Sequence, residues 1–159
     1  AQQSGETASA LVPREQLEER LQSELKRAAS FDQDLSLAIL SVAYSPDDEA
    51  LWELEIHKFF IFRDLAFQYG PDRACIILPN IELEEAIRSL RDFSRRIAAT
   101  LPASRVNAGL SARSGRLLDS ATMLKEAEAA LATSMQDDQQ AIFGFRAYPA
   151  KYRALLAEG

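Results

Sequence analysis

Residues 67–79 read Phe-Gln-Tyr-Gly-Pro-Asp-Arg-Ala-Cys-Ile-Ile-Leu-Pro, and this stretch decides the fold. Its centre, residues 70–73, has the composition of a tight turn, because glycine and proline supply the backbone angles that turns need. The runs on either side, Asp64–Tyr69 and Ala74–Leu78, are rich in the aromatic and branched residues that strands favour. The stretch therefore predicts a β-hairpin.

Apolar residues on both sides of this hairpin recur at the spacing of helices and strands. Leucines follow Pro13 at intervals of four, as on one face of an amphipathic helix, and the apolar run that starts at Leu35 is long enough for a strand buried on both faces. The further elements predicted are a helix over Pro13–Ala29, a strand over Leu35–Tyr44, a helix over Asp47–Phe62, a helix over Glu82–Thr100 capped by Asn80, a strand over Arg105–Ala112, a helix from Asp119 or Ser120 to Met135, and a last strand over Ala141–Ala147.

The order of these elements predicts an α/β (α+β) fold. A strand pair in mid-chain, flanked by strand-helix units, gives a central mixed sheet of five strands with helices on its faces. Residues 1–10 are small and polar without periodicity, and we interpret them as a linker or cloning remnant. Residues 11–159 are expected to form a single domain, since their length suits one hydrophobic core.

Composition excludes several classes of function. With 18 basic and 24 acidic side chains the formal charge is −6, so binding to a nucleic acid polymer through overall charge is not expected. One cysteine excludes an internal disulfide, and one histidine excludes a zinc site built on histidines. No apolar run is long enough to cross a bilayer, which predicts a cytoplasmic domain. Ala1, in place of Met, suggests a piece of a longer polypeptide, whose other part would hold a sensor or a membrane anchor.

The hairpin stretch resembles the signature R-Y-G-G-[DE]-E-F-x-x-x-L-P of the GGDEF domain of bacterial diguanylate cyclases, which condense two GTP molecules into cyclic di-GMP. Three further segments resemble motifs of this family in the same order. Ala8–Leu21 resembles the entry motif L-T-G-L-x-N-R, Asn107–Ser111 lies where the family has S-I-G-V-A, and Ala127–Leu131 lies where it has A-D-x-A-L. The resemblance implies the palm-like fold of nucleotidyl cyclases over about residues 8–147.

The residues at the family's metal-binding positions differ. The resemblance implies two carboxylates at the end of the first strand, where this chain has Ser41-Val-Ala43, and a glutamate in the hairpin turn, where it has Arg73. Carboxylates hold the divalent cations that neutralise charge in phosphoryl transfer, whereas a guanidinium repels them. We therefore expect no catalytic residue, no metal, no cofactor and no enzyme activity. The degenerate signature comprises Gly70, Pro71, Asp72, Arg73 and Ala74.

The family's guanine-recognition elements after the first strand are absent, and its triphosphate-binding Lys and Arg correspond to Met135 and Gln139. The family's inhibitory cyclic di-GMP site has the pattern R-x-x-D ahead of the hairpin, of which this chain keeps only the acid, with an arginine two residues out of place. The candidate nucleotide-binding residues are Arg63 and Asp64, with Arg88 and Arg91 on the following helix. A surface ion pair and a solvated helix face are the alternative interpretations.

Three hypotheses for function follow from the resemblance. The first is a catalytically inactive GGDEF-like domain that serves as a regulatory or protein-interaction module in bacterial signal transduction. The second is a non-catalytic receptor for cyclic di-GMP or GTP, and the third is a residual diguanylate cyclase. The partners expected are an upstream sensor or signalling domain of the same polypeptide, a protein partner or a second copy of the domain, and cyclic di-GMP.

Overall fold

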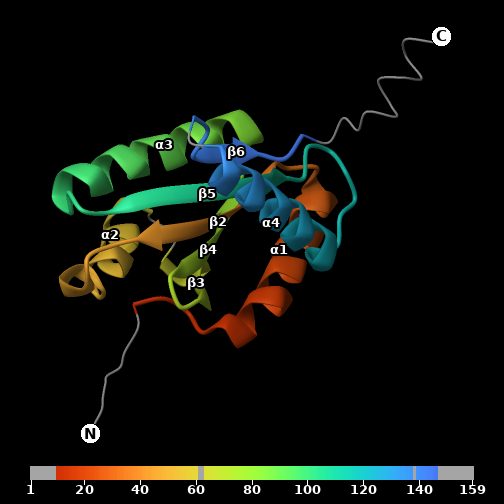
Figure 1. The fold of residues 1–159 in the computed structure, drawn as a ribbon. Coiled ribbons are helices and arrows are strands. Elements are labelled where there is room, and N and C mark those ends of the chain that lie inside the picture. The colour runs from red at the N-terminus through yellow and green to blue at the C-terminus, as the bar shows by residue number, and fades with distance from the viewer. Residues whose placement is uncertain (1–9, 61–62, 138, 147–159) are drawn as a thin grey trace, which may run out of the picture.

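The computed structural model describes residues 10–60, 63–137 and 139–146 of the chain (Figure 1). The predicted order of elements is confirmed. The helices are α1 (Leu17–Phe31), α2 (Leu51–Phe59), α3 (Leu83–Thr100) and α4 (Ser120–Gln136), with short 3-10 turns η1 (Arg14–Gln16), η2 (Pro46–Asp48) and η3 (Arg63–Leu65). The strands are β2 (Leu35–Ala43), β3 (Ala66–Gly70), β4 (Arg73–Pro79), β5 (Arg105–Ala112) and β6 (Ile142–Gly144).

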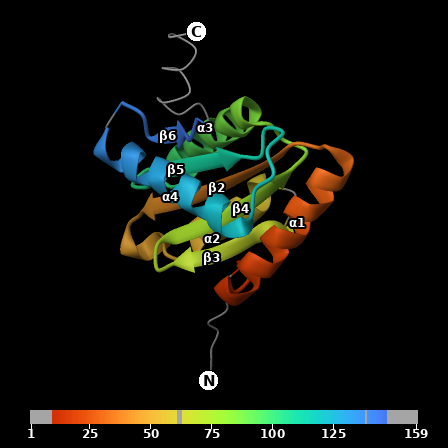
Figure 2. The ribbon, with the colours of Figure 1, turned by 90° about the vertical axis from the view of Figure 1, so that its right-hand side faces the viewer.

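The described strands form one mixed sheet of five, in the order β3-β4-β2-β5-β6. The predicted hairpin is the antiparallel pair β3 and β4, and β2 pairs antiparallel with both β4 and β5. Only β6 runs parallel to its neighbour, β5. Helices α1 and α4 lie on one face of this sheet, and α2 and α3 lie on the other (Figure 2).

Strand β2 lies at the centre because it can be buried from both sides. Leu37 and Ile39 pack into the core under α1 and α4, whereas Ala38 and Leu40 pack into the core under α2 and α3. All four are fully buried. The continuous apolar run therefore predicted the central strand correctly, since alternate residues of a strand point to opposite faces.

The cap of α3 differs from the prediction. Asn80 does not cap this helix: it lies at φ 61°, and its backbone N–H donates to the carbonyl of Asp34. Glu82 is the capping residue, because its extended backbone brings the carboxylate to the N–H groups of Glu84 and Glu85, at 3.1 and 2.8 Å. A longer acidic side chain thus takes the place that the sequence pattern assigned to the asparagine.

The predicted helix over Asp47–Phe62 is also shorter in the structure. The chain first makes the 3-10 turn η2, and the α-helix begins only at Leu51 and ends at Phe59. The C-cap residue Phe60 is extended, with φ −97° and ψ 123°, and it is buried in the core. Pro46 lies before the predicted start, where a proline suits a first turn, and the predicted end at Phe62 lies outside the described residues.

The chain enters the sheet along the outer edge of β3. Val12 pairs in parallel with Phe67 of that strand: its N–H donates to Ala66 and its carbonyl accepts from Gln68, at 2.9 and 2.8 Å. Leu11 is buried in the core on the α2 and α3 side, and α1 then continues on the opposite face. The entry segment therefore crosses from one face of the sheet to the other and covers its edge.

Candidate functional site

The hairpin turn and the end of β2 lie side by side, as the resemblance implied. Ser41 of β2 pairs in register with Arg73 of β4 on one side and with Asn107 of β5 on the other. The turn that carries Gly70, Pro71, Asp72 and Arg73 therefore lies at the same edge of the sheet as residues 41–43. The structure brings together the two segments at which sequence comparison places the family's metal ligands.

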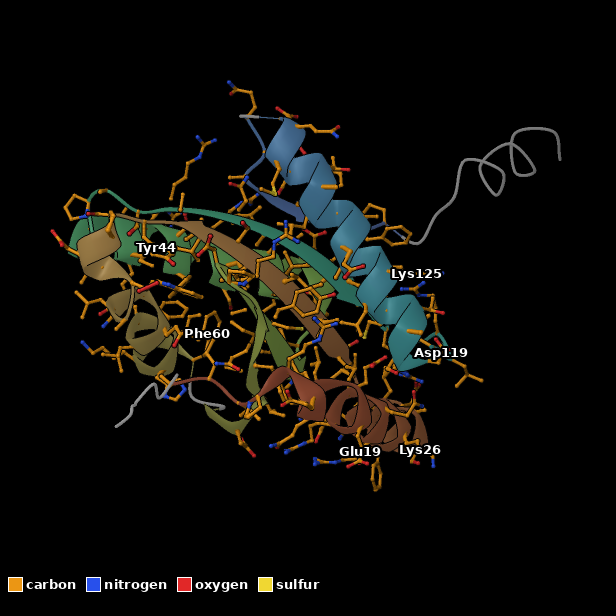
Figure 3. The ribbon with its side chains drawn as sticks, turned by 60° about the horizontal axis from the view of Figure 1, so that its bottom comes forward. Glu19, Lys26, Tyr44, Phe60, Asp119 and Lys125 are labelled. Atoms are coloured by element: carbon orange, nitrogen blue, oxygen red, sulfur yellow. The ribbon has the colours of Figure 1, made fainter. Side chains whose placement is uncertain are left out.

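The carboxylate of Asp72 faces the α2 side of the sheet. It accepts a hydrogen bond of 2.6 Å from the hydroxyl of Tyr44, and the Asp72 carbonyl accepts another from the N–H of Val42, at 2.9 Å. The ring of Tyr44, which is labelled in Figure 3, stacks on Trp52 of α2, with ring centres 5.9 Å apart. The hydrogen bond to Asp72 is the largest cause that raises the pKa of Tyr44 to about 12.

Arg73 faces the opposite side of the sheet. It lies two residues before Cys75, which is buried beneath α1 and α4, and it shares the face of its cross-strand neighbour Ser41. The side chain is half-buried. Within the described residues its guanidinium has no ion pair or hydrogen bond. The turn thus separates its two charges, with the acid on one face and the base on the other.

These residues do not fit a divalent cation. Ser41 and Ala43 offer no carboxylate, the Asp72 carboxylate already accepts a hydrogen bond from the Tyr44 hydroxyl on the other face, and Arg73 carries a positive charge. Mg²⁺ prefers carboxylate oxygens and is repelled by a guanidinium. In the part of the chain that the structure describes, no three acidic, histidine or cysteine side chains gather where they could hold a metal ion.

Tyr69, at the end of β3, joins three elements beside this turn. The Arg14 guanidinium lies 4.0 Å over its ring and donates to its carbonyl at 3.2 Å, and its hydroxyl donates to the carboxylate of Glu128 on α4. Burial and this carboxylate raise the pKa of Tyr69 above its usual range. Sequence analysis missed this contact, although Arg14 and Glu128 both lie in segments that resemble family motifs.

Asp64 lines a hollow between α1 and the edge of the sheet. Its carboxylate accepts from the guanidinium of Arg20 at 3.2 Å, and Arg20 also donates to Glu24. The hollow measures about 320 Å³ and is lined by Val12, Gln16, Glu19, Arg20, Ser23, Asp64 and Phe67. Asp64 thus forms an ion pair with Arg20, which the sequence pattern did not single out, whereas the expected pair with Arg63 stays a prediction. Arg63 begins η3, but its side chain lies outside the described residues.

Arg88 and Arg91 lie apart from this hollow. Both are exposed on α3, which covers the sheet face opposite to α1 (Figure 2). The structure therefore does not bring these two arginines together with Asp64 into one site. On the same helix Arg95 pairs with Asp92, as expected for a solvated face with both charges.

Comparison with known proteins supports the fold. No family model matches the chain. An uncharacterized protein of Treponema pallidum (strain Nichols) is 37% identical over 101 residues, which cover 60% of this chain and 55% of that protein. The chain thus spans about half the length of this curated relative.

Solved structures match over most of the chain. The active GGEEF domain of a diguanylate cyclase from Vibrio cholerae matches with a TM-score of 0.72 and 17% identity, over 86% of this chain and 98% of that one. The GGDEF domain of DgcB from Caulobacter crescentus, in complex with cyclic di-GMP, matches with a TM-score of 0.73 and 16% identity, over 91% of this chain and 98% of that one. The diguanylate cyclase SiaD from Pseudomonas aeruginosa, in complex with its activator SiaC, matches with a TM-score of 0.67 and 19% identity, over 79% of this chain and 55% of that one.

These matches correct one prediction. The sequence analysis predicted that the chain is not an enzyme, and this is contradicted, because the Vibrio cholerae domain of the same fold is an active diguanylate cyclase domain. The shared fold gives no ground for excluding an enzyme. Among the described residues, no helix is long and apolar enough to span a membrane. The predicted resemblance and fold class are confirmed: the chain has the fold of the GGDEF domains of diguanylate cyclases.

Proposed function

We propose that residues 11–159 form a regulatory domain of cyclic di-GMP signalling in the bacterial cytoplasm. Its partner would be a protein, another domain of the same polypeptide, or a second copy of this domain. The complex of SiaD with its activator SiaC gives a precedent for a protein partner of a diguanylate cyclase that contains this fold.

The observation that carries this proposal is the arrangement of the hairpin turn. Asp72 is held by the Tyr44 hydroxyl on one face, and the side chain of Arg73 leaves the sheet on the other. The Asp72 carboxylate therefore already has a hydrogen-bond donor, and Arg73 gives the turn a positive charge. Such a surface suits recognition of an acidic group on a partner.

Deletion in the whole polypeptide tests the regulatory role. Removing residues 11–159 is expected to change the cellular cyclic di-GMP level or the downstream output. In parallel, the purified domain is incubated with GTP and Mg²⁺, and cyclic di-GMP is sought by chromatography. Product that disappears in Asp72→Ala would show that the domain itself makes cyclic di-GMP, and an unchanged cyclic di-GMP level and output after the deletion would overturn the regulatory role.

A second candidate function is a receptor for cyclic di-GMP or GTP, and the hollow at Asp64 favours it. A guanine base presents N–H donors that a carboxylate accepts, and acceptors at O6 and N7 that a guanidinium donates to. Asp64 and Arg20 place these two groups in one hollow of about 320 Å³, within the usual range for small-molecule sites.

Calorimetric titration with each nucleotide tests this receptor. Asp64→Ala and Arg20→Ala are expected to abolish saturable heat. Arg88→Ala and Arg91→Ala serve as matched controls, because these arginines lie on the opposite face of the sheet. If an Arg88 or Arg91 variant loses the binding heat equally, the nucleotide binds elsewhere. If Asp64→Ala leaves the binding heat unchanged, the site is refuted.

A further inference from the structure

We propose that the hollow at Asp64 binds a primary ammonium group at the end of an aliphatic chain, as polyamines and lysine side chains carry it. The inference goes beyond the proposed regulatory function. It also gives the hollow a ligand of opposite charge to the nucleotides of the second candidate function, so that experiment can tell the two apart.

One wall of the hollow is a single face of α1 and of the turn before it. Its polar residues are three or four positions apart, which places them on the same side of a helix. They are Gln16, Glu19, Arg20 and Ser23. The opposite wall is the edge of the sheet, where Asp64 of η3 lies with Val12 and Phe67.

Arg20 is the only base among the described residues that line the hollow, and two acids already neutralise it. Its Nε donates to Glu24 and its Nη2 donates to Asp64, both at 3.2 Å. The side chain of Glu24 is 7% exposed and is not part of the lining, so it holds Arg20 from within the protein. Arg20 therefore adds little positive charge to the space in front of it.

Two carboxylates of the lining keep open oxygens. Within the described residues the Glu19 carboxylate has no hydrogen bond or ion pair, and Asp64 uses only Oδ2 for Arg20. Both side chains are exposed, so a ligand can reach them from solvent. The described lining thus carries more negative than positive charge, which attracts a cation and repels phosphate groups.

The apolar part of the lining suits an aliphatic chain. Phe67 is buried and Val12 is half-buried, and both lie in the same hollow as the two open carboxylates. Lysine-like chains bury their methylene groups on such surfaces and keep the charged end at a polar rim. The volume of about 320 Å³ is large enough for a chain of this kind.

The geometry favours an ammonium over other cations. Because Arg20 occupies Oδ2 of Asp64, this acid cannot receive both arms of a second guanidinium. An ammonium has three rotatable donors, each of which needs only a single oxygen. A metal ion is not favoured, since no three acidic, histidine or cysteine side chains of the described residues gather to hold one.

An NMR titration of the full chain, with spermidine and Nα-acetyl-lysine amide as probes, tests the site. Saturable shifts of the backbone amides of Val12 and Ser23 are expected, and the probe that binds more tightly identifies a polyamine or a lysine side chain as the source. Glu19→Gln is expected to weaken binding at least threefold. Glu18→Gln is the matched control: it makes the same change of charge at an exposed residue outside the hollow and is expected to leave binding unchanged.

Arg20→Gln separates this site from the nucleotide receptor. The substitution removes a positive charge and frees Oδ2 of Asp64, so it is expected to strengthen ammonium binding, whereas a nucleotide receptor would lose a donor. The proposal is overturned if neither probe gives saturable shifts, if Glu19→Gln leaves binding unchanged, or if Arg20→Gln, shown to be folded by circular dichroism, weakens it. None of these results alters the outcome of the deletion that tests the regulatory function, so the two failures are distinguishable.

Discussion

Replacing Tyr44 with phenylalanine removes one hydroxyl and leaves the ring on Trp52. The lost contact is the 2.6 Å hydrogen bond to the carboxylate of Asp72, which joins the hairpin turn to the end of β2. Hydrogen bonds to charged groups contribute roughly 1.5–3 kcal/mol when buried. Because Tyr44 is only half-buried, we expect the variant to be about 1 kcal/mol less stable, which lowers Tm by about 2–4 °C in a domain of this size.

A double-mutant cycle in urea unfolding isolates this bond. Tyr44→Phe and Asp72→Ala are measured singly and together, and a coupling free energy of about 1 kcal/mol is expected. Tyr44→Phe combined with Asp64→Ala is the control, because Asp64 pairs with Arg20 and not with the tyrosine. Strictly additive effects of the Tyr44 and Asp72 substitutions would refute the reasoning.

The same bond predicts a dependence on pH. The pKa of Tyr44 is raised from 10.0 to about 12 in the folded chain, so folding favours the protonated phenol. The contribution of this hydrogen bond to the free energy of unfolding is therefore complete below pH 10 and is lost as the pH rises from 10 to 12. The free energies of unfolding of wild type and Tyr44→Phe are expected to converge over this range, and an unchanged difference up to pH 12 would contradict the assignment.

Three further outcomes are expected. Gly109→Ala is expected to cost at least about 1–3 kcal/mol in urea unfolding, because an added Cβ would lie 2.1 Å from a backbone nitrogen of α4. Cys75 is expected to react with Ellman's reagent at pH 8 only after unfolding, since burial raises the pKa of its thiol and removes access. Glu55→Gln is expected to cost about 1 kcal/mol, measured as a lower Tm, because the buried carboxylate contacts Lys58 and Arg96, whose exposed ends can turn to water.

Local sequence patterns predicted the secondary structure well where the signal is itself local. The strand over Arg105–Ala112 has the predicted bounds, and the turn at residues 70–73 joins the two predicted strands. The cap of α3 was predicted wrongly, because Asn80 and Glu82 both lie within reach of the helix start and only the backbone angles decide between them. A short-range pattern cannot contain those angles, since contacts with Asp34 across the fold help to set them.

The candidate site likewise has features that the sequence determines and features that only the tertiary structure determines. The sequence alone determined which side chains stand at the turn and at the end of β2, and therefore that Arg73 and Ser41 occupy positions where the family has acids. Only the tertiary structure decided that Asp72 bonds to Tyr44 on one face while Arg73, in register with Ser41, lies on the other. The physical reason is that strand register sets which residues meet and on which side of the sheet they do so, and register depends on packing between segments more than 30 residues apart in the chain.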